Sequence, residues 1–262
     1  MVIEIKNPKP INFKKFNSEF RIDGISGFMR LRNEEEFVER SILTWIKYVD
    51  ELVIVYNDCT DKTPEILNRL EKEYDKIKLY HYLPKVYCFN TNEFKLLDED
   101  SINSFCFYSN FALSKTSYKI CVKIDGDHIG IESNLEKIYN YLKTNPMENT
   151  VLYFSGFNLN YISNDIYIKK DNAYAGNGDV FYFNSGEKNK FGKHYLYDGY
   201  ELLYVYAKHI YNIGFIFWHT HFMKKRNITI KDIQYDHENL IVNKNKNNYY
   251  YKFNKKNLSK ID

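Results

Sequence analysis

Asp125, Gly126 and Asp127 have the residue types and spacing of a site for a divalent cation. They follow the apolar run 120–124, whose β-branched residues predict a buried strand. Two carboxylates separated by one residue on an extended backbone point the same way, and the glycine between them allows a tight turn. Like charges this close repel unless a cation lies beside them, and carboxylate oxygens suit Mg²⁺ or Mn²⁺. The motif therefore predicts an ion with open positions for substrate phosphate oxygens, although Asp-Gly-Asp is also a common turn.

The first half of the chain is expected to alternate between strand and helix. Strands are predicted at 24–31, 51–56 and 77–82. Asn33 is expected to cap one intervening helix, and Thr60 or Asp61 to cap another that runs to about Tyr74. Polar residues follow each strand, and in an open parallel sheet the carboxyl ends of the strands form the ligand crevice. The pattern predicts an α/β fold with a mainly parallel central sheet and flanking helices.

The second half is expected to be mixed. Strands are predicted at 151–161, 165–169 and 180–183, with a glycine turn at 176–179 before the last of them. A helix is predicted to open at 198–201. A strand at 213–218 then delivers His219 and His221. A histidine beside Trp218 at a strand end is either a metal ligand or a core residue.

Composition limits the classes of function. The 262 residues fit one domain with a large core, and 37 Lys+Arg against 34 Asp+Glu give no field that would favour nucleic acid. The four cysteines lack Cys-x-x-Cys spacing, so free thiols in a reducing compartment are expected. No apolar run approaches the length of a spanning helix. A cytoplasmic protein is predicted, with at most peripheral membrane contact through the basic tail 239–262.

Two stretches carry a resemblance to a known family. The segment 26–67, with Arg-x-Arg-Asn-Glu after the first strand and Tyr-Asn-Asp-Cys-Thr-Asp after the second, resembles the nucleotide-binding half of GT-A glycosyltransferases (family 2-like). Lys-Ile-Asp-Gly-Asp-His, 123–128, resembles their Asp-x-Asp metal motif. The pair of motifs is similar to bacterial β-1,4-N-acetylgalactosaminyltransferases of lipooligosaccharide synthesis. The resemblance covers about half of the chain and implies one GT-A domain over 1–262, with a nucleotide-sugar half at about 22–130 and an acceptor-side half at about 150–228.

The resemblance implies a role for each matching residue. Asn57 and Asp58 lie where such enzymes bind uracil and ribose, although Asp58 and Asp61 are equally explained as loop or cap residues. The implied metal ligands are Asp125, Asp127, and His219 or His221. Lys224 and Lys225 would neutralise the diphosphate. The residues expected at the nucleotide are Arg30, Arg32, Asn33, Glu34, Asn57, Asp58, Asp125 and Lys224.

The reaction implied is sugar transfer from a UDP-sugar to a hydroxyl, dependent on Mn²⁺ or Mg²⁺. The acceptor would be a bacterial surface glycan, lipooligosaccharide or capsule, free or lipid-linked, reached from the cytoplasmic face of the inner membrane. Inversion requires one carboxylate base. Asp198 and Glu201 are preferred to Asp179, although the first two are also explained as helix caps.

Two other functions remain open at this point. A nucleotidyltransferase on a sugar phosphate would also use paired carboxylates, but residues 30–36 hold three consecutive acids and no glycine-rich phosphate loop. A non-catalytic nucleotide-sugar binder has little need for a double carboxylate followed by His-x-His.

Overall fold

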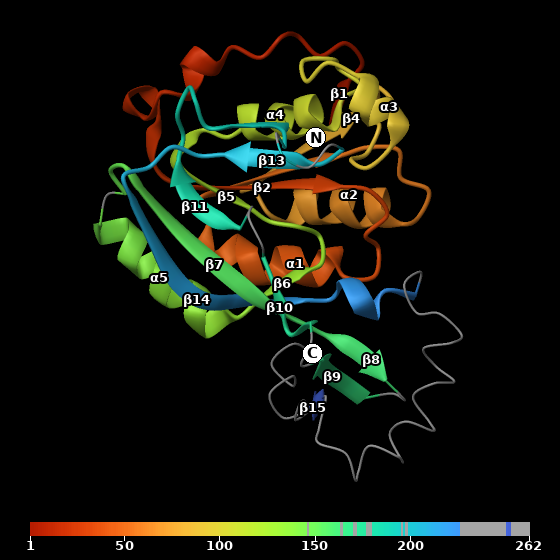
Figure 1. Cartoon of the computed structure of the whole chain (residues 1–262), viewed down its shortest axis with the longest axis vertical. Helices are drawn as coiled ribbons and strands as arrows, with labels where there is room; N and C mark the ends of the chain where they lie inside the picture. Colours follow the sequence, from red (N-terminus) through yellow and green to blue (C-terminus); the bar gives the residue numbers. More distant parts are fainter. Residues whose placement is uncertain are drawn as a thin grey trace.

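A computed structural model of the chain describes residues 1–145, 147–162, 165–169, 172–176, 180–194, 196, 199–225 and 250–252. Its centre is a ten-stranded sheet in the order β1-β4-β3-β2-β5-β11-β7-β14-β6, with β10 paired to β7 (Figure 1). The strands of this sheet are β1 (Ile3–Ile5), β2 (Ile22–Leu31), β3 (Glu51–Tyr56), β4 (Ile77–Tyr82), β5 (Tyr118–Lys123), β6 (His128–Gly130), β7 (Thr150–Asn158), β10 (Tyr174–Ala175), β11 (Phe181–Asn184) and β14 (His209–His219).

The sheet changes character at β11. From β1 to β5 all neighbouring strands are parallel. Strand β11 is antiparallel to both β5 and β7, whereas β14 runs parallel to β7 and antiparallel to β6. The α/β fold with a parallel first half and a mixed second half is therefore confirmed.

Helices and two small sheets complete the described structure. The helices are α1 (Val38–Trp45), α2 (Thr63–Glu73), α3 (Asn92–Leu96), α4 (Phe105–Ser114) and α5 (Glu132–Thr144), with 3-10 turns η1 (Phe13–Phe16), η2 (Ser18–Phe20), η3 (Ile46–Tyr48) and η5 (His221–Met223). The small sheets are β12 (Lys190–Lys193) with β13 (Glu201–Tyr204), and β8 (Asn160–Ile162) with β9 (Asp165–Lys169) and β15 (Tyr250–Lys252).

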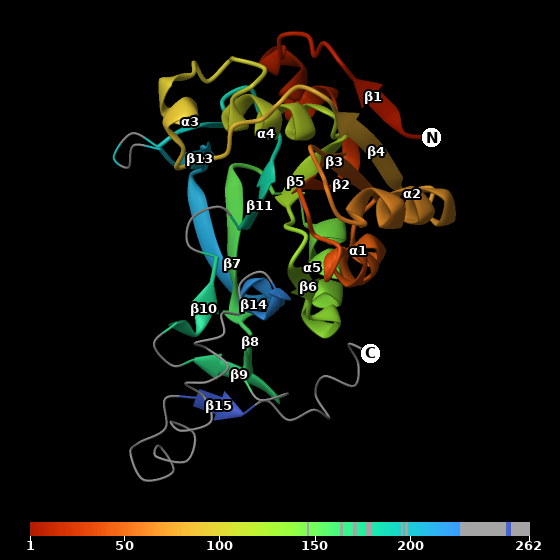
Figure 2. The same cartoon turned by 90° about the vertical axis from the view of Figure 1, so that its right-hand side faces the viewer.

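Helices cover both faces of the parallel half (Figure 2). Every residue of β3 is buried, and its side chains alternate between the faces. Leu52 and Ile54 belong to a core cluster shared with α1, α2 and α5, whereas Val53 and Val55 belong to one shared with α4. The parallel half of the sheet therefore lies between two hydrophobic cores, one on each face.

Strand predictions that rested on the pattern of hydrophobic residues were confirmed. The strands Glu51–Tyr56 and Ile77–Tyr82 have the predicted bounds. The N-cap residue of α2 is Lys62, and Asp61, one position before it, accepts a hydrogen bond at Oδ1 from the backbone N–H of Thr63 at 2.9 Å.

Two predictions about helix starts were wrong. Asn33 does not cap α1, because the helix begins at Val38 and Asn33 adopts a left-handed φ of 56°. Its Oδ1 instead accepts a hydrogen bond from the N–H of Thr60 at 2.7 Å. The helix predicted to open at 198–201 is also wrong, because Glu201 begins strand β13, which pairs with β12.

The four cysteines are free thiols, as predicted. In the part of the chain that the structure describes, no helix combines the length and the apolar character needed to span a bilayer. Most of the basic tail 239–262 lies outside the described residues.

Glu51, the first residue of β3, contacts residues of the neighbouring strands at the end of the sheet opposite the cavity. Its buried carboxylate accepts hydrogen bonds from Ser26 Oγ at 2.6 Å and from Ser117 N, and it pairs with Lys78. Burial would raise the pKa of Glu51, but the hydrogen bonds from these three residues outweigh it and hold the pKa below its usual value.

Glu51→Gln is therefore expected to lower the free energy of unfolding by about 1.5–3 kcal/mol at pH 7, the range for hydrogen bonds to charged groups. A depressed native pKa gives stability that is complete above the ordinary carboxyl pKa of 4.5 and is lost as the pH falls through the native value. Urea unfolding should show the gap between variant and wild type shrinking below that pH. A gap independent of pH would contradict this account, and exposed Glu4→Gln is the control.

Candidate active site

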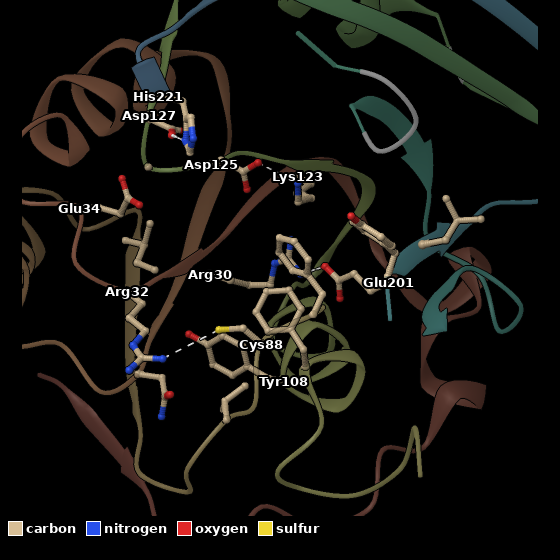
Figure 3. Close-up of a pocket in the computed structure, with 18 of the residues that line it drawn as sticks. Arg30, Arg32, Glu34, Cys88, Tyr108, Lys123, Asp125, Asp127, Glu201 and His221 are labelled. Atoms are coloured by element: carbon tan, nitrogen blue, oxygen red, sulfur yellow. Dashed lines mark hydrogen bonds and ion pairs between the residues drawn. The ribbon is translucent and has the colours of Figure 1, made fainter. Parts of the chain in front are cut away.

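A cavity of about 930 Å³ opens at the carboxyl ends of β2, β3 and β5 (Figure 3). Residues from the ends of these strands meet there, as predicted for an open α/β sheet. Strand β14 reaches the same cavity from the mixed half with His219, and η5 follows it with His221. The predicted site residues that line it are Arg30, Arg32, Glu34, Asn57, Asp125, Asp127, Glu201, His219, His221 and Lys224.

Asp127, His219 and His221 form a cluster that can hold a metal ion. Their ligand atoms all lie within 4.8 Å of one another. Asp127 Oδ2 is 3.7 Å from His219 Nε2 and 3.6 Å from His221 Nδ1. The structure thus brings together three of the four predicted metal ligands and leaves Asp125 outside the group.

His219 is held in the tautomer that a metal ligand needs. Its Nδ1 lies 2.6 Å from Asn158 Oδ1. The Asn158 Nδ2 group donates to the carbonyl oxygens of Asn172 and Tyr174, which fixes the amide so that its oxygen faces the histidine. Nδ1 therefore carries the proton, and the lone pair of Nε2 points toward Asp127.

Burial also keeps His219 neutral. Burial, together with the neighbouring His128, lowers the pKa of the imidazole to about 4. Burial opposes the charged form of Asp127, but the hydrogen bond from His221 and nearby positive charge hold its pKa well below the usual value. A neutral imidazole beside an ionised carboxylate is the protonation pattern of a metal site.

Helix α1 holds the backbone of the Asp-Gly-Asp turn. Ser41 Oγ donates to the carbonyl oxygens of Asp125 at 3.0 Å and of His128 at 2.9 Å. Trp45 Nε1 donates to the same His128 oxygen at 2.9 Å. Buried side chains of α1 therefore fix the turn that presents both carboxylates.

Gly126 is required by close packing. A Cβ at this position would lie 2.9 Å from both Glu34 Cγ and Leu31 Cδ2, closer than such atoms approach in proteins. The carboxylates on either side of this glycine also take different partners, instead of pointing together at one ion as expected.

The negative charge of Asp125 is balanced by side chains next to it. Its Oδ2 lies 2.8 Å from Lys123 Nζ and 3.6 Å from His128 Nε2. Burial opposes the charged form, but Lys123 and then His128 outweigh it and hold the pKa of Asp125 far below its usual value. Asp125 remains charged at the cavity wall, where hydroxyl groups of a bound sugar can donate to it.

Arg30 and Glu201 form a buried ion pair in the wall of the cavity. Their side chains are 7% and 9% exposed, and Ser109 Oγ donates to Glu201 Oε2 at 2.7 Å. The guanidinium lies 4.9 Å from the ring centres of both Phe105 and Phe191. Burial raises the pKa of Glu201, and Arg30 opposes this rise. A raised pKa suits a carboxylate that takes up a proton.

Asn57 presents a hydrogen-bond acceptor. Its Nδ2 donates to the carbonyl oxygens of Tyr82 at 2.7 Å and Pro84 at 2.9 Å. Within the described part of the chain, no group donates a hydrogen bond to the buried Oδ1, and a buried acceptor without a donor is costly unless a ligand supplies one. Arg32 lies beside it in the cavity wall and pairs with exposed Asp58 at 2.6 Å.

The remaining predicted residues are not in this cavity. Asn33 and Asp58 do not line it; Asn33 lies with Thr60 in a neighbouring depression. Asp179 and Asp198, the other predicted bases, lie outside the described residues. Sequence reasoning missed Asn158 and the pairing of Lys123 with Asp125. Asn158 is one polar residue in a strand, so no local pattern could have identified it.

Comparisons with known proteins add similarities of fold. No protein-family model and no curated protein matches the chain. Among solved structures, S. aureus TarS (residues 1–349) is 14% identical over 76% of this chain and 60% of its own, with a TM-score of 0.46. Glucosyl-3-phosphoglycerate synthase from Mycobacterium tuberculosis, with Mn²⁺, UDP and phosphoglyceric acid, is 16% identical over 60% and 50%, with a TM-score of 0.34.

A mannosyltransferase from Pyrobaculum calidifontis, with GDP-Man and Mn²⁺, is 16% identical over 56% of this chain and 39% of its own, with a TM-score of 0.36. The chain thus spans between 39% and 60% of the length of these proteins. Identities and TM-scores this low assign no activity to the chain.

Proposed function

We propose that this protein is a metal-dependent glycosyltransferase of the GT-A type, which moves a sugar from a UDP-sugar to a hydroxyl group. The observation that carries the proposal is the cluster of Asp127, His219 and His221 at the wall of the 930 Å³ cavity. Positive charge stabilises the diphosphate of a nucleotide-sugar, and this cavity offers ligands for a metal cation beside groups suited to a base and a sugar.

The donor set fits Mn²⁺ or Mg²⁺. Asp127 would supply an oxygen, and His219 and His221 one nitrogen each; imidazole nitrogen favours Mn²⁺ over Mg²⁺. When bound, the ion supplies positive charge to the departing diphosphate. With only these three protein ligands, such an ion would have room for phosphate oxygens of the donor.

The chain's own residues would orient the rest of the donor. Asn57 Oδ1 would accept a hydrogen bond from the base of the nucleotide, and N3–H of uracil can donate one. Because the amide nitrogen is already bonded to a carbonyl oxygen, Asn57 would select a base that has a donor at this position. Asp125, held charged by Lys123, would accept hydrogen bonds from sugar or ribose hydroxyls.

Glu201 is proposed as the base that takes the acceptor proton, with Asp198 and Asp179 as alternatives. Its carboxylate lies in the same cavity as the metal cluster, and burial raises its pKa. Glu201→Gln is expected to lower kcat by about 10²–10⁴, the usual contribution of a general base, with UDP affinity unchanged. A kcat within a few fold of wild type would assign Glu201 only to holding Arg30.

The proposed function is tested by product analysis. Purified protein is incubated with Mn²⁺ and a panel of UDP-sugars, and the products are separated. Release of free UDP supports the glycosyltransferase, pyrophosphate formation from a sugar phosphate and UTP supports a nucleotidyltransferase, and neither product supports a binding module. A thermal-shift screen of UDP, GDP and UDP-sugars, with and without Mn²⁺, first identifies the nucleotide, because a ligand raises the melting temperature according to its affinity.

The finer proposal concerns donor and acceptor. We infer N-acetylgalactosamine as the donor sugar, inversion at its anomeric carbon, and a lipooligosaccharide or capsule acceptor from the resemblance of 26–67 and 123–128 to bacterial β-1,4-N-acetylgalactosaminyltransferases. The same resemblance supports a single domain that works in the cytoplasm at the inner membrane.

A further inference from the structure

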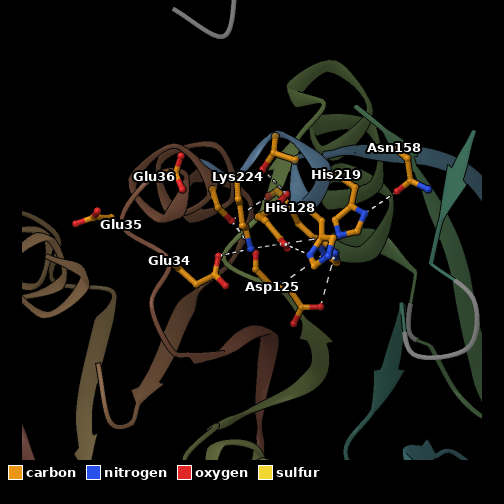
Figure 4. A network of polar contacts seen from close by, with 12 residues as sticks. Glu34, Glu35, Glu36, Asp125, His128, Asn158, His219 and Lys224 are labelled. Carbon is orange, nitrogen blue, oxygen red and sulfur yellow. Dashed lines mark hydrogen bonds and ion pairs between the residues drawn. The ribbon is translucent and has the colours of Figure 1, made fainter. Parts of the chain in front are cut away.

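Lys224 places its ammonium group on the carboxylate that the proposed metal ion needs. Its Nζ lies 2.6 Å from Asp127 Oδ2 and 2.6 Å from Glu34 Oε2 (Figure 4). The lysine side chain is 3% exposed, and the two carboxylates are 9% and 13% exposed. This is a buried cation between two anions, from which water is largely excluded.

The lysine and the histidines share one oxygen atom. Asp127 Oδ2, which accepts the hydrogen bond from Lys224, is also the atom nearest to His219 Nε2 and His221 Nδ1. An ion held by Asp127 and the two imidazoles would draw on the same oxygen. A divalent ion and an ammonium that close together repel strongly in a buried site.

We propose that Lys224 occupies the place of the divalent cation in the metal-free protein and is exchanged for it when the donor binds. The inference rests on the proposed function and adds an internal competitor to the metal site. Without metal, the ammonium balances the negative charge of Asp127 and Glu34 in a buried place. Free Mn²⁺ or Mg²⁺ must displace this ion pair and therefore binds weakly.

The exchange predicts that the diphosphate of the donor strengthens metal binding. An anionic diphosphate that arrives with the ion offers the released ammonium a new partner, so metal and donor bind better together than separately. Lys224 directly follows η5, which carries His221, so one segment supplies both a metal ligand and the displaced cation. The long, flexible lysine side chain allows Nζ to move without a change in the fold.

The test is a calorimetric titration of the full chain with Mn²⁺ alone, without nucleotide. Lys224→Met removes the competing charge, and we expect Mn²⁺ to bind at least about tenfold more tightly than to wild type, since a buried ion pair no longer has to be broken. Lys224→Gln, which keeps a hydrogen-bond donor but removes the charge, is expected to tighten binding in the same direction. Lys224→Arg retains the charge and should remain as weak as wild type.

A matched control removes a lysine–carboxylate pair elsewhere. Lys47 pairs with Glu132 at 3.1 Å on the surface, and Lys47→Met should leave Mn²⁺ affinity unchanged. As a second readout, Lys224→Met should melt below wild type without metal, and Mn²⁺ should raise its melting temperature by more than that of wild type.

Mn²⁺ affinity in Lys224→Met and Lys224→Gln that equals or falls below the wild-type value would overturn the exchange. If all variants bind Mn²⁺ equally while UDP release still requires Mn²⁺, only this inference fails. If no variant binds Mn²⁺ and UDP gives no thermal shift, both the exchange and the proposed function fail.

Discussion

Asp127→Asn is expected to lower sugar transfer by on the order of a thousandfold, because a metal clamp on a leaving phosphate contributes several kcal/mol to the transition state. Asparagine keeps the size of the side chain but removes the negative charge that Mn²⁺ needs. Lys224 retains its 2.6 Å contact with Glu34, so the variant should fold. Initial rates of UDP release at saturating donor measure the loss, and circular dichroism checks the fold.

The control for this variant is Asp23→Asn. Asp23 is 91% exposed and pairs with Lys119 at 2.6 Å on the surface, so its loss should not change the rate. Normal turnover by Asp127→Asn, or by wild type in the presence of a chelator, would remove the metal from the proposed mechanism. The cavity would then need another source of positive charge, with Lys224 the nearest candidate to Asp127.

His219→Ala is expected to weaken Mn²⁺ binding by about 100-fold or more, since loss of a supporting residue alone costs 10–100-fold at metal sites. His221→Ala should cost less. The His219 ring is fixed by Asn158, is kept neutral by burial and is 20% exposed, whereas His221 is 46% exposed and competes with water. Titration of each variant with Mn²⁺, in the presence of UDP, measures the difference.

Asn158→Ala separates ligation from positioning. It leaves both imidazoles in place but removes the acceptor that fixes the His219 tautomer, so we expect about a tenfold loss of Mn²⁺ affinity. Equal and mild losses in His219→Ala and His221→Ala would assign both histidines to structure and leave Asp127 without its proposed partners.

Much of the fold could be predicted because its signals are local. Residues 52–56 form an apolar run of strand length, and residues 77–82 are apolar or aromatic apart from Lys78 and His81. The spacing of Val38, Ile42 and Trp45 marks a helix face. The cap at Asn33 failed because its side chain found a partner in Thr60, 27 residues away. The strand at Glu201 was missed because its pairing with β12 is decided by tertiary contact.

The sequence by itself determined that a carboxylate motif and a His-x-His motif each end a strand, because strand ends are marked by a change from apolar to polar residues. Only the tertiary structure decided what each group contacts. Lys123 forms an ion pair with Asp125. Asp127 instead lies beside the histidines and accepts a hydrogen bond from Lys224, which is 97 residues away in the sequence. Arg30 and Glu201 pair across 171 residues. Contacts at such separations depend on the order of strands in the sheet and on burial, neither of which is written in any short stretch of the chain.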